Sequence, residues 1–315
     1  MKLFKVQKNS LVEINKNSFD LEKDIQSLVE RNLKRLFNLE FISTEFTVGE
    51  FRLDSLGFNE ETSSFVIIEY KKGNSYSVVD QGYSYLSVML NNTAEFILKY
   101  NTKTKKFLEK KDFDWSQSRV IFISPSFNSY QKNSVNFKDV PFELWEIQKY
   151  DDGFISLEQH KSNSKESIDK FTSGNQLINT VSNVVTVASE SDHTSRTNEV
   201  SLEAWEAIKE YYLADNEIDL NVVQSYISLK KKNTNICYVI FQKTRLQVDI
   251  LLGYEKSEGK DKSKILKIAD PENKGKIHER IFSNGVKEIL YRMIVNSSKD
   301  VDYMKLIVNQ KLNAI

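Results

Sequence analysis

The sequence predicts a mixed α/β domain followed by a smaller α+β domain, and three observations lead to this fold class. An amphipathic segment at 19–37 precedes three strand-like segments, and a second helical segment separates these from further apolar strands. The 315-residue chain also has the length of two ordinary domains. Residues 161–198 are polar and rich in Ser, Thr and Asn. We therefore expect domains at 1–160 and 199–315 and a linker at 161–198, with room for one helix in the linker.

Composition and charge are typical of a soluble globular protein. The chain has 40% hydrophobic and 28% charged residues, and Lys plus Arg equal Asp plus Glu at 44 each. This balance gives no general attraction to nucleic acid or membrane, so any polyanion site is local. We find no signal peptide and no apolar run of the roughly 18 residues that span a membrane, and we expect a cytoplasmic protein with no membrane partner. Cys237 lies in an apolar run and predicts a buried thiol.

The first domain begins with an alternating segment at 3–14 that predicts a hairpin at the domain edge. From 19 to 37 the apolar residues recur at helical spacing and predict an amphipathic helix. Glu22, Gln26 and Glu30 lie near or beside the buried face of this helix.

Three strands are predicted next, at about 40–46, 50–58 and 64–71. Residues 59–62, Asn-Glu-Glu-Thr, have turn chemistry and predict an antiparallel pair of the second and third strands. The third strand is continuously apolar at 65–68, which predicts a central strand covered on both faces.

The rest of the chain alternates between segments with the periodicity of a helix and segments with that of a strand. After a break at 72–75, we expect helices at 76–90 and 94–99, then strands at 118–124, 142–147 and 154–157, which complete a mixed sheet. In the second domain we expect a helix from 201, strands near 226–230, 235–242 and 245–252, and helices near 276–282 and 301–312.

Two acidic residues stand at neighbouring strand ends in this arrangement. The carboxylates of Asp54 and Glu69 are placed to converge on one Mg²⁺ or Mn²⁺, ions that prefer oxygen ligands. The Tyr70 backbone carbonyl is a natural third ligand, and Glu22 completes the set directly or through water. Lys71 lies two residues after Glu69, on the same sheet face, where its ammonium orients the attacking water and offsets phosphate charge.

Gln81, in the early turns of the following helix, is placed to hold the water or a phosphate oxygen. Glu30 is the alternative to Glu22 for the helix position. The metal would serve as Lewis acid, template and activator of water.

These residues carry a resemblance to a known superfamily. Glu22 on a helix, Asp54 in RLDSLG, Glu69 and Lys71 in IIEYK, and Gln81 in DQGYSYL together resemble the PD-(D/E)XK nucleases, and within them the catalytic domain of NucS-like endonucleases. The resemblance covers roughly 19–124.

The resemblance implies a restriction-endonuclease-like sandwich, in which helices flank a mixed central sheet. It also implies metal-dependent cleavage of DNA, with Asp54, Glu69 and Lys71 as the catalytic core. Leu53 stands where the motif has proline, a residue that many members lack. The second domain resembles small domains of unassigned function that follow nuclease-like domains in bacterial proteins.

Simpler explanations of the same residues remain. Asp54 and Glu69 can be solvated strand ends, with Lys71 as their salt-bridge partner. Glu22 can be a helix N-terminal carboxylate favoured by the helix dipole, and Gln81 can face solvent. An acid at the end of a buried strand nevertheless needs a partner, which favours the site.

Several other side chains are candidates for minor roles. The basic run at 99–111 is either a phosphate-binding patch or a solvated loop, and the candidate nucleic-acid contacts are Lys72, Lys103, Lys105 and Lys106. Tyr76, Tyr83 and Tyr85 can stack on bases, although their helical spacing favours core packing. We expect His160, His193 and His278 to be solvated and Asp249 to pair with a basic residue.

The residues therefore favour a two-domain, metal-dependent deoxyribonuclease that hydrolyses phosphodiester bonds. The alternative is a catalytically silent nuclease-like module that binds nucleic acid or a protein partner, and a third reading is a structural or regulatory protein. The presence of Asp54, Glu69 and Lys71 together favours the enzyme. Single-stranded, branched, mismatched and modified DNA, and RNA, all remain candidate substrates, and a homodimer is possible.

Overall fold

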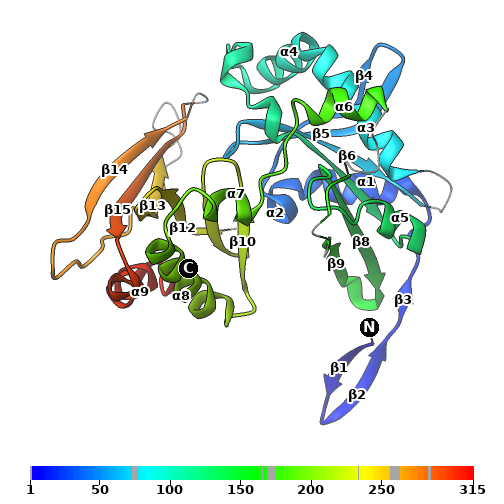
Figure 1. Ribbon diagram of the computed structural model, residues 1–315. Coiled ribbons are helices and arrows are strands. Elements are labelled where there is room, and N and C mark those ends of the chain that lie inside the picture. The colour runs from blue at the N-terminus through cyan, green and yellow to red at the C-terminus, as the bar shows by residue number, and fades with distance from the viewer. Residues whose placement is uncertain are drawn as a thin grey trace. The chain divides into compact units, whose positions relative to one another are not determined.

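The computed structural model describes residues 2–72, 77–162, 164, 166–168, 175–232, 234–255, 263–282 and 285–315 (Figure 1). The chain divides into two compact units, Met1–Val187 and Ala188–Ile315.

The first unit combines helices and strands. In chain order these are strands β1 (Leu3–Gln7), β2 (Ser10–Ile14) and β3 (Lys16–Asn17), helices α1 (Glu22–Arg31) and α2 (Leu33–Phe37), strands β4 (Glu40–Val48), β5 (Phe51–Asn59) and β6 (Ser64–Tyr70), helices α3 (Val78–Asn91) and α4 (Thr93–Thr104), strand β7 (Arg119–Ser124), helix α5 (Ser129–Ser134), strands β8 (Phe142–Tyr150) and β9 (Ile155–His160), and helix α6 (Gln176–Ser182).

The main sheet of this unit is mixed. Its strands follow the order β3-β8-β7-β6-β5-β4, and β9 pairs with β8. Strands β4, β5 and β6 are antiparallel neighbours, whereas β6, β7 and β8 run parallel to one another. The predicted antiparallel pair and the mixed α/β character are therefore confirmed.

Strand β6 lies at the centre of this sheet, and all of its residues are buried. Val66 and Ile68 pack with residues of α1 such as Ile25 on one face. Phe65 and Ile67 pack in a second cluster, with residues of α3 and α4, on the other face. The continuous apolar run arises because successive side chains of this strand enter different cores, as the sequence predicted.

The predicted helix at 19–37 is two helices. Asn32 has φ −121° and ψ 14°, so α1 ends there and α2 begins at the next residue. The Asn32 side-chain amide donates to the Leu28 carbonyl, 2.8 Å away. This local bond satisfies a carbonyl at the end of α1 and accounts for the interruption.

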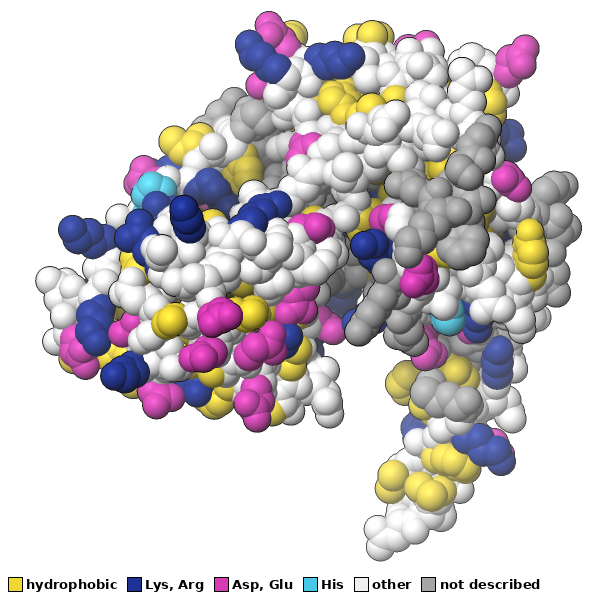
Figure 2. All heavy atoms as spheres, in the orientation of Figure 1, with side chains coloured by type: hydrophobic (Ala, Val, Ile, Leu, Met, Phe, Trp, Pro, Cys, Tyr) yellow, Lys and Arg dark blue, Asp and Glu magenta, His cyan; other side chains and the backbone are white. Residues whose placement is uncertain are grey.

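The predicted N-terminal hairpin is confirmed as a separate two-stranded sheet of β1 and β2. Figure 2 shows hydrophobic side chains gathered on this hairpin, which lies apart from the main sheet of its unit in Figure 1. Val6 and Leu11 are 71% and 66% exposed.

The second unit is an antiparallel sheet with helices. Its elements are helices α7 (Glu190–Thr194) and α8 (Glu199–Leu213), strands β10 (Ile218–Val222), β11 (Ile227–Lys231), β12 (Thr234–Gln242), β13 (Arg245–Glu255), β14 (Lys276–Ile281) and β15 (Lys287–Val295), and helix α9 (Val301–Leu312). The strand order is β10-β11-β12-β13-β15-β14. Trp205 of α8 and Ile307 of α9 pack in one core with alternate residues of β12, β13 and β15.

The structure differs from two expectations outside the main sheet. The helix predicted at 276–282 is wrong, because these residues form the edge strand β14. Residues 161–198, expected as a polar linker with room for one helix, include both α6 and α7 in their described part. Ile178 and Val181 of α6 belong to a core cluster of the first unit, because their three-residue spacing puts both on one helix face.

Candidate active site

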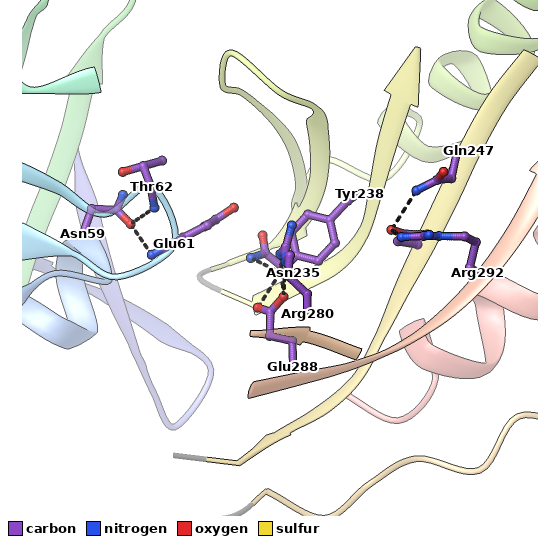
Figure 3. A network of polar contacts seen from close by, with 10 residues as sticks. Asn59, Glu61, Thr62, Asn235, Tyr238, Gln247, Arg280, Glu288 and Arg292 are labelled. Atoms are coloured by element: carbon purple, nitrogen blue, oxygen red, sulfur yellow. Dashed lines mark hydrogen bonds and ion pairs between the residues drawn. The ribbon is translucent and has the colours of Figure 1, made fainter. Parts of the chain in front are cut away.

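The hairpin of β5 and β6 places the two predicted acids next to each other. The Asn59 side-chain oxygen Oδ1 accepts the backbone N–H groups of Glu61 and Thr62, at 2.9 and 3.3 Å, and so fixes the predicted turn (Figure 3). The ladder pairs Ser55 with Ile68. Residues opposite each other on antiparallel strands share a face, so one step further along the ladder Asp54 and Glu69 lie on the same side.

The Asp54 carboxylate is held by the partner strand. Its Oδ2 accepts the Tyr70 backbone N–H at 3.0 Å. Because the bond runs from backbone to side chain, it fixes the carboxylate at the end of β6 rather than in solvent.

Glu69 is 4% exposed, and its carboxylate accepts from two donors. Its Oε1 accepts the Lys71 ammonium at 2.8 Å and the Gln81 amide at 2.7 Å. Its Oε2 is buried and has no hydrogen-bond partner within the described part of the chain. The residue is therefore not a solvated strand end.

Lys71 follows β6 directly. Its backbone N–H donates to the Ile123 carbonyl at 2.8 Å, which continues the pairing with β7 beyond the last residue of the strand. The side chain is 16% exposed. The Lys71 ammonium thus lies beside the Glu69 carboxylate, where solvent reaches it only in part.

Helix α3 brings Gln81 and Tyr85 to the same carboxylate. The Gln81 amide also donates to the Tyr85 hydroxyl at 2.8 Å. Gln81 Oε1 is buried and meets no donor among the described residues. Tyr85 had no predicted role beyond base stacking or core packing, although its four-residue spacing from Gln81 places both on one helix face.

The two helix glutamates take different positions. Glu22, in the first turn of α1, interacts electrostatically with Asp54 and Lys71. Glu30 accepts instead from the Ser55 hydroxyl at 2.6 Å. Glu22 is thus near Asp54 and Lys71, whereas Glu30 bonds to Ser55 and Gln26.

Gln26 joins α1 to this end of the sheet, and the sequence assigned it no role. Its amide donates to Glu30 Oε1 and Thr44 Oγ1, both at 3.1 Å, and to the Asp54 carbonyl at 3.0 Å. It is 7% exposed. Because its acceptors come from three elements, Gln26 fixes α1 relative to the Asp54 backbone.

Burial and crowding of like charges raise the pKa values of all three acids. Burial, followed by Asp54, raises the pKa of Glu69 to about 7. Burial also raises the pKa of Asp54, against the opposing Tyr70 N–H bond, and burial with Asp54 raises that of Glu22. A bound cation would favour the charged form of each acid.

The residues fit a hard divalent cation in part. Asp54 and Glu69 supply carboxylate oxygens on one face, and two buried oxygens, Glu69 Oε2 and Gln81 Oε1, lack hydrogen bonds within the described residues. Such oxygens suit Mg²⁺ or Mn²⁺. No group of three or more His, Cys, Asp or Glu side chains in the described ranges is assembled as a metal site.

The predicted basic contacts are distributed over different elements. Lys103 lies near the end of α4, with its ammonium 5.5 Å from the centre of the Phe41 ring. Lys105 follows α4 with φ +61°, and Lys106 beside it is half-buried. The Lys72 ammonium donates to the Asp20 carbonyl. Their role in binding nucleic acid stays a prediction.

The aromatic and cysteine predictions have mixed outcomes. Tyr83 is fully buried, with its ring 4.9 Å from that of Phe142, so it packs in the core. Tyr76 lies outside the described residues. Cys237 is buried, as predicted, and burial raises the pKa of its thiol to about 12.

The second unit has polar networks of its own (Figure 3). Arg292 donates to both carboxylate oxygens of Asp249, at 2.7 and 2.8 Å, which confirms the predicted pairing. Glu288 accepts from Tyr238 at 2.9 Å and from Arg280 Nε at 3.0 Å. These contacts join β12, β13, β14 and β15.

His193 does not match the expectation of a solvated histidine. It is fully buried, and its Nε2 lies 2.7 Å from the Val223 carbonyl. The neighbouring residues in the sequence are polar, which is why an exposed side chain was expected.

Among the described residues, no helix is both long enough and apolar enough to cross a membrane.

The fold and this site define a mixed α/β protein with a buried carboxylate–lysine cluster at the end of a β-hairpin. The chain belongs to the same protein family as an uncharacterized protein of Haemophilus influenzae (strain ATCC 51907 / DSM 11121 / KW20 / Rd). The two are 38% identical over 314 residues, which cover 99% of each chain. No family model matches the sequence.

Two solved structures show distant likeness. One is EndoMS in a complex with double-stranded DNA, with 16% identity, a TM-score of 0.27, and coverage of 43% of this chain and 60% of that one. The other is a repair endonuclease from Pyrococcus abyssi, with 15% identity, a TM-score of 0.22, and coverage of 38% and 45%. TM-scores this low do not establish a shared fold.

Proposed function

We propose that the protein is a metal-dependent nuclease that hydrolyses phosphodiester bonds in DNA. The observation that carries this proposal is the state of Glu69. Its carboxylate is buried on the same face as Asp54, is held by Lys71 and Gln81, and keeps one oxygen without a described partner. A buried acid arranged in this way calls for a cation.

Within the proposal, Asp54 and Glu69 hold Mg²⁺ or Mn²⁺, with Glu22 and the Tyr70 backbone carbonyl as the further ligands. When bound, the divalent cation supplies Lewis-acid stabilisation of the charge that develops on the phosphate. Gln81 keeps the Glu69 carboxylate in place through the 2.7 Å bond. Tyr85, bonded to the same amide, restrains Gln81 in turn.

Lys71 provides the remaining positive charge. Its ammonium, 2.8 Å from Glu69, can donate to a phosphate oxygen or orient the attacking water. In the reaction a water oxygen forms a bond to phosphorus and the bond to one ester oxygen breaks. The proton lost by the water is balanced by the proton that the leaving oxygen gains, so no other reactant is required.

DNA is proposed as the polymer because the motifs around Glu22, Asp54, Glu69, Lys71 and Gln81 resemble those of NucS-like endonucleases. The restriction-endonuclease-like sandwich is proposed on the same basis. The two core clusters on opposite faces of β6 are compatible with it.

The test is cleavage of single-stranded, branched and mismatched DNA by purified protein with Mg²⁺ or Mn²⁺. Removing one of the core charges at a time, as Asp54→Asn, Glu69→Gln and Lys71→Met, should each lower cleavage by at least about 100-fold, as loss of a group that stabilises transition-state charge does. Glu95→Gln, a neutralisation at an exposed position of α4, should leave cleavage unchanged. Absence of cleavage on all substrates, or full activity of Glu69→Gln, would overturn the proposal.

One observation favours the alternative, a nuclease-like module that binds without cutting. The described residues hold no assembled group of three metal-binding side chains. In that case calorimetry with Mn²⁺ should detect no binding that depends on Asp54, while DNA or a protein partner still binds.

A further inference from the structure

We propose that a pocket beside the candidate active site binds a second phosphate group of the nucleic-acid strand. This phosphate is the neighbour, in the same strand, of the phosphate at which the strand is cut. The pocket has a volume of about 510 Å³. This inference rests on the proposed function, because it assigns a second phosphate of the same substrate to a second group of residues.

The pocket lies where the parallel strands of the sheet end. Ser124 is the last residue of β7, Gln148 is near the end of β8, and Lys72 lies two residues beyond β6; all three line the pocket. These strands run parallel, so their carboxyl ends meet at one edge. In open α/β sheets, ligands bind in the crevice outside these ends.

The charge of the pocket is opposite to that of the carboxylate cluster. Lys16 and Lys72 line it, and none of its described lining residues is acidic. Lys72 directly follows Lys71, so the pocket and the cluster are neighbours in the chain. A strand of nucleic acid can therefore place one phosphate at the carboxylates, through a cation, and the next at the lysines.

The two lysines differ in how they are held. The Lys72 ammonium donates to the Asp20 carbonyl, which fixes its position and leaves further N–H groups to donate. For the Lys16 ammonium, no described residue serves as an acceptor or an ion partner, although its backbone is paired with Tyr150. Lys16 is thus a cation on an anchored strand whose charge is available to a ligand.

The residues that β7 and β8 contribute to the pocket are polar and hydrogen-bonded. The Ser124 hydroxyl donates to the Ser126 carbonyl at 2.8 Å and accepts the Ser126 N–H at 3.3 Å. The Gln148 amide donates to the Pro125 carbonyl. These bonds fix the backbone of the turn after β7, so that Ser126, an exposed residue that lines the pocket, is held in place before a ligand binds.

The phosphate bound there has two possible positions in the strand, internal or at a 5′ end. Both have the same chemistry, and two oligonucleotides of one sequence distinguish them. One carries a 5′-phosphate and the other a 5′-hydroxyl.

The experiment measures binding of both labelled oligonucleotides to the full chain by fluorescence anisotropy in EDTA, over a range of salt concentrations. Lys16→Gln should weaken binding several-fold and reduce the slope of log K against log salt by about 1, as loss of one phosphate contact does. An effect on both oligonucleotides indicates an internal phosphate, and an effect on the phosphorylated one alone indicates a 5′ end. Lys149→Gln is the matched control, because this exposed lysine of β8 lies next to Gln148 but does not line the pocket.

A second variant guards against an effect of misfolding. Ser126→Glu puts a negative charge into the pocket at an exposed position, and it should weaken binding as Lys16→Gln does. Circular dichroism checks that each variant is folded. If Lys16→Gln and Ser126→Glu bind as the Lys149→Gln control does, or if neither oligonucleotide binds at all, the pocket proposal is overturned.

Cleavage assays on the same proteins separate the two proposals. Cleavage by the wild type, together with unchanged binding of Lys16→Gln, would refute the pocket and leave the nuclease standing. Weakened binding of Lys16→Gln without any cleavage by the wild type would refute the nuclease and leave the phosphate site standing.

Discussion

At the residue scale, the Glu69 carboxyl makes the free energy of unfolding depend on pH and on a bound metal ion. Burial, and next the Asp54 charge, raise its pKa from 4.5 to about 7. Between these two values the folded protein binds a proton that the unfolded chain has lost. The stability that this proton contributes is fully present below about pH 4.5, and it is lost as the pH rises through about 7.

Glu69→Gln should remove this dependence, because the amide stays neutral. In EDTA at pH 8 the variant should have a larger free energy of unfolding than the wild type. This difference should shrink towards pH 5, and its upper limit is about 1.4 kcal/mol for each unit of the Glu69 pKa shift. Thermal unfolding at several pH values measures this. Adding Mn²⁺ at pH 8 should raise the unfolding temperature of the wild type and not that of the variant. Identical pH profiles for the two proteins would contradict the assignment.

His193 should change the stability of the protein with pH in the opposite direction. Its Nε2 donates to the Val223 carbonyl in the neutral form, and Nδ1 is buried with no partner among the described residues. Burial lowers the pKa of the imidazole below its usual 6.5. The unfolded chain therefore binds the proton more readily, and the second unit should lose stability as the pH falls below about 6.5, towards the lowered pKa of the folded state.

The prediction is a lower unfolding temperature of the second unit at pH 5.5 than at pH 7.5, followed by Trp205 fluorescence. His193→Gln should flatten this difference, whatever its effect on stability at pH 7.5. The control is His278→Gln, at an exposed position of β14, which should retain the wild-type profile. An imidazole pKa above 6.5 for His193 in NMR titration would refute the assignment.

Asp54, Glu69 and Lys71 could be predicted as a group because strand alternation and a four-residue turn determine which side chains face each other. Gln26 could not be assigned a role from sequence. Its acceptors come from α1, β4 and β5, and nothing in the local pattern indicates that these elements meet.

At the scale of elements, the position of helix α3 determines where Gln81 lies. Gly82 follows Gln81 and faces β8, where a Cβ atom on it would approach Phe142 Cε1 to 2.5 Å. The Phe142 ring is itself packed against Tyr83, with ring centres 4.9 Å apart. The glycine therefore allows a close approach of helix and sheet.

Gly82→Ala tests this approach, because helix propensity and packing predict opposite signs. In an exposed helix the change would stabilise by about 1 kcal/mol. Here the clash with Phe142 should destabilise the first unit by about 1–3 kcal/mol, measured by urea unfolding. Phe142→Leu in the same chain should relieve part of the loss. Ser87→Ala, at a partly exposed position of the same helix, is the control; stabilisation by Gly82→Ala would contradict the packing argument.

The misprediction of β14 as a helix has a simple cause. Ile277 and Ile281 are four residues apart, a spacing that fits one face of a helix and equally one face of a strand. On β14 both isoleucines are exposed, at 64% and 69%. Their positions therefore do not mark a buried face, and the sequence pattern could not distinguish a helix from a strand. By contrast, the apolar run at 65–68 is short and rich in β-branched residues, which favours a strand covered on both faces, and β6 was predicted correctly.

At the scale of the whole molecule, each hydrophobic cluster belongs to one unit. The clusters around β6 comprise residues between Phe19 and Val185, and those of the second sheet comprise residues between Ala204 and Val308. Each unit thus buries apolar surface within itself, which is the requirement for a domain that folds by itself. The division of the chain follows from these cores more than from the polar composition of 161–198, part of which packs in the first core.

Two separate cores predict two unfolding transitions, each sensitive to its own residues. Ile307→Ala creates a cavity in the second unit and should lower its stability by about 2–5 kcal/mol, seen as an earlier change in Trp205 fluorescence. Ile121→Ala should do the same for the first unit, reported by Trp115 and Trp145, because Ile121 is fully buried there. Variants that keep Trp205 alone, or Trp115 and Trp145 without it, separate the two signals. If either core substitution shifts both signals together by the same amount, the units unfold as one, and the division into two independent cores is incorrect.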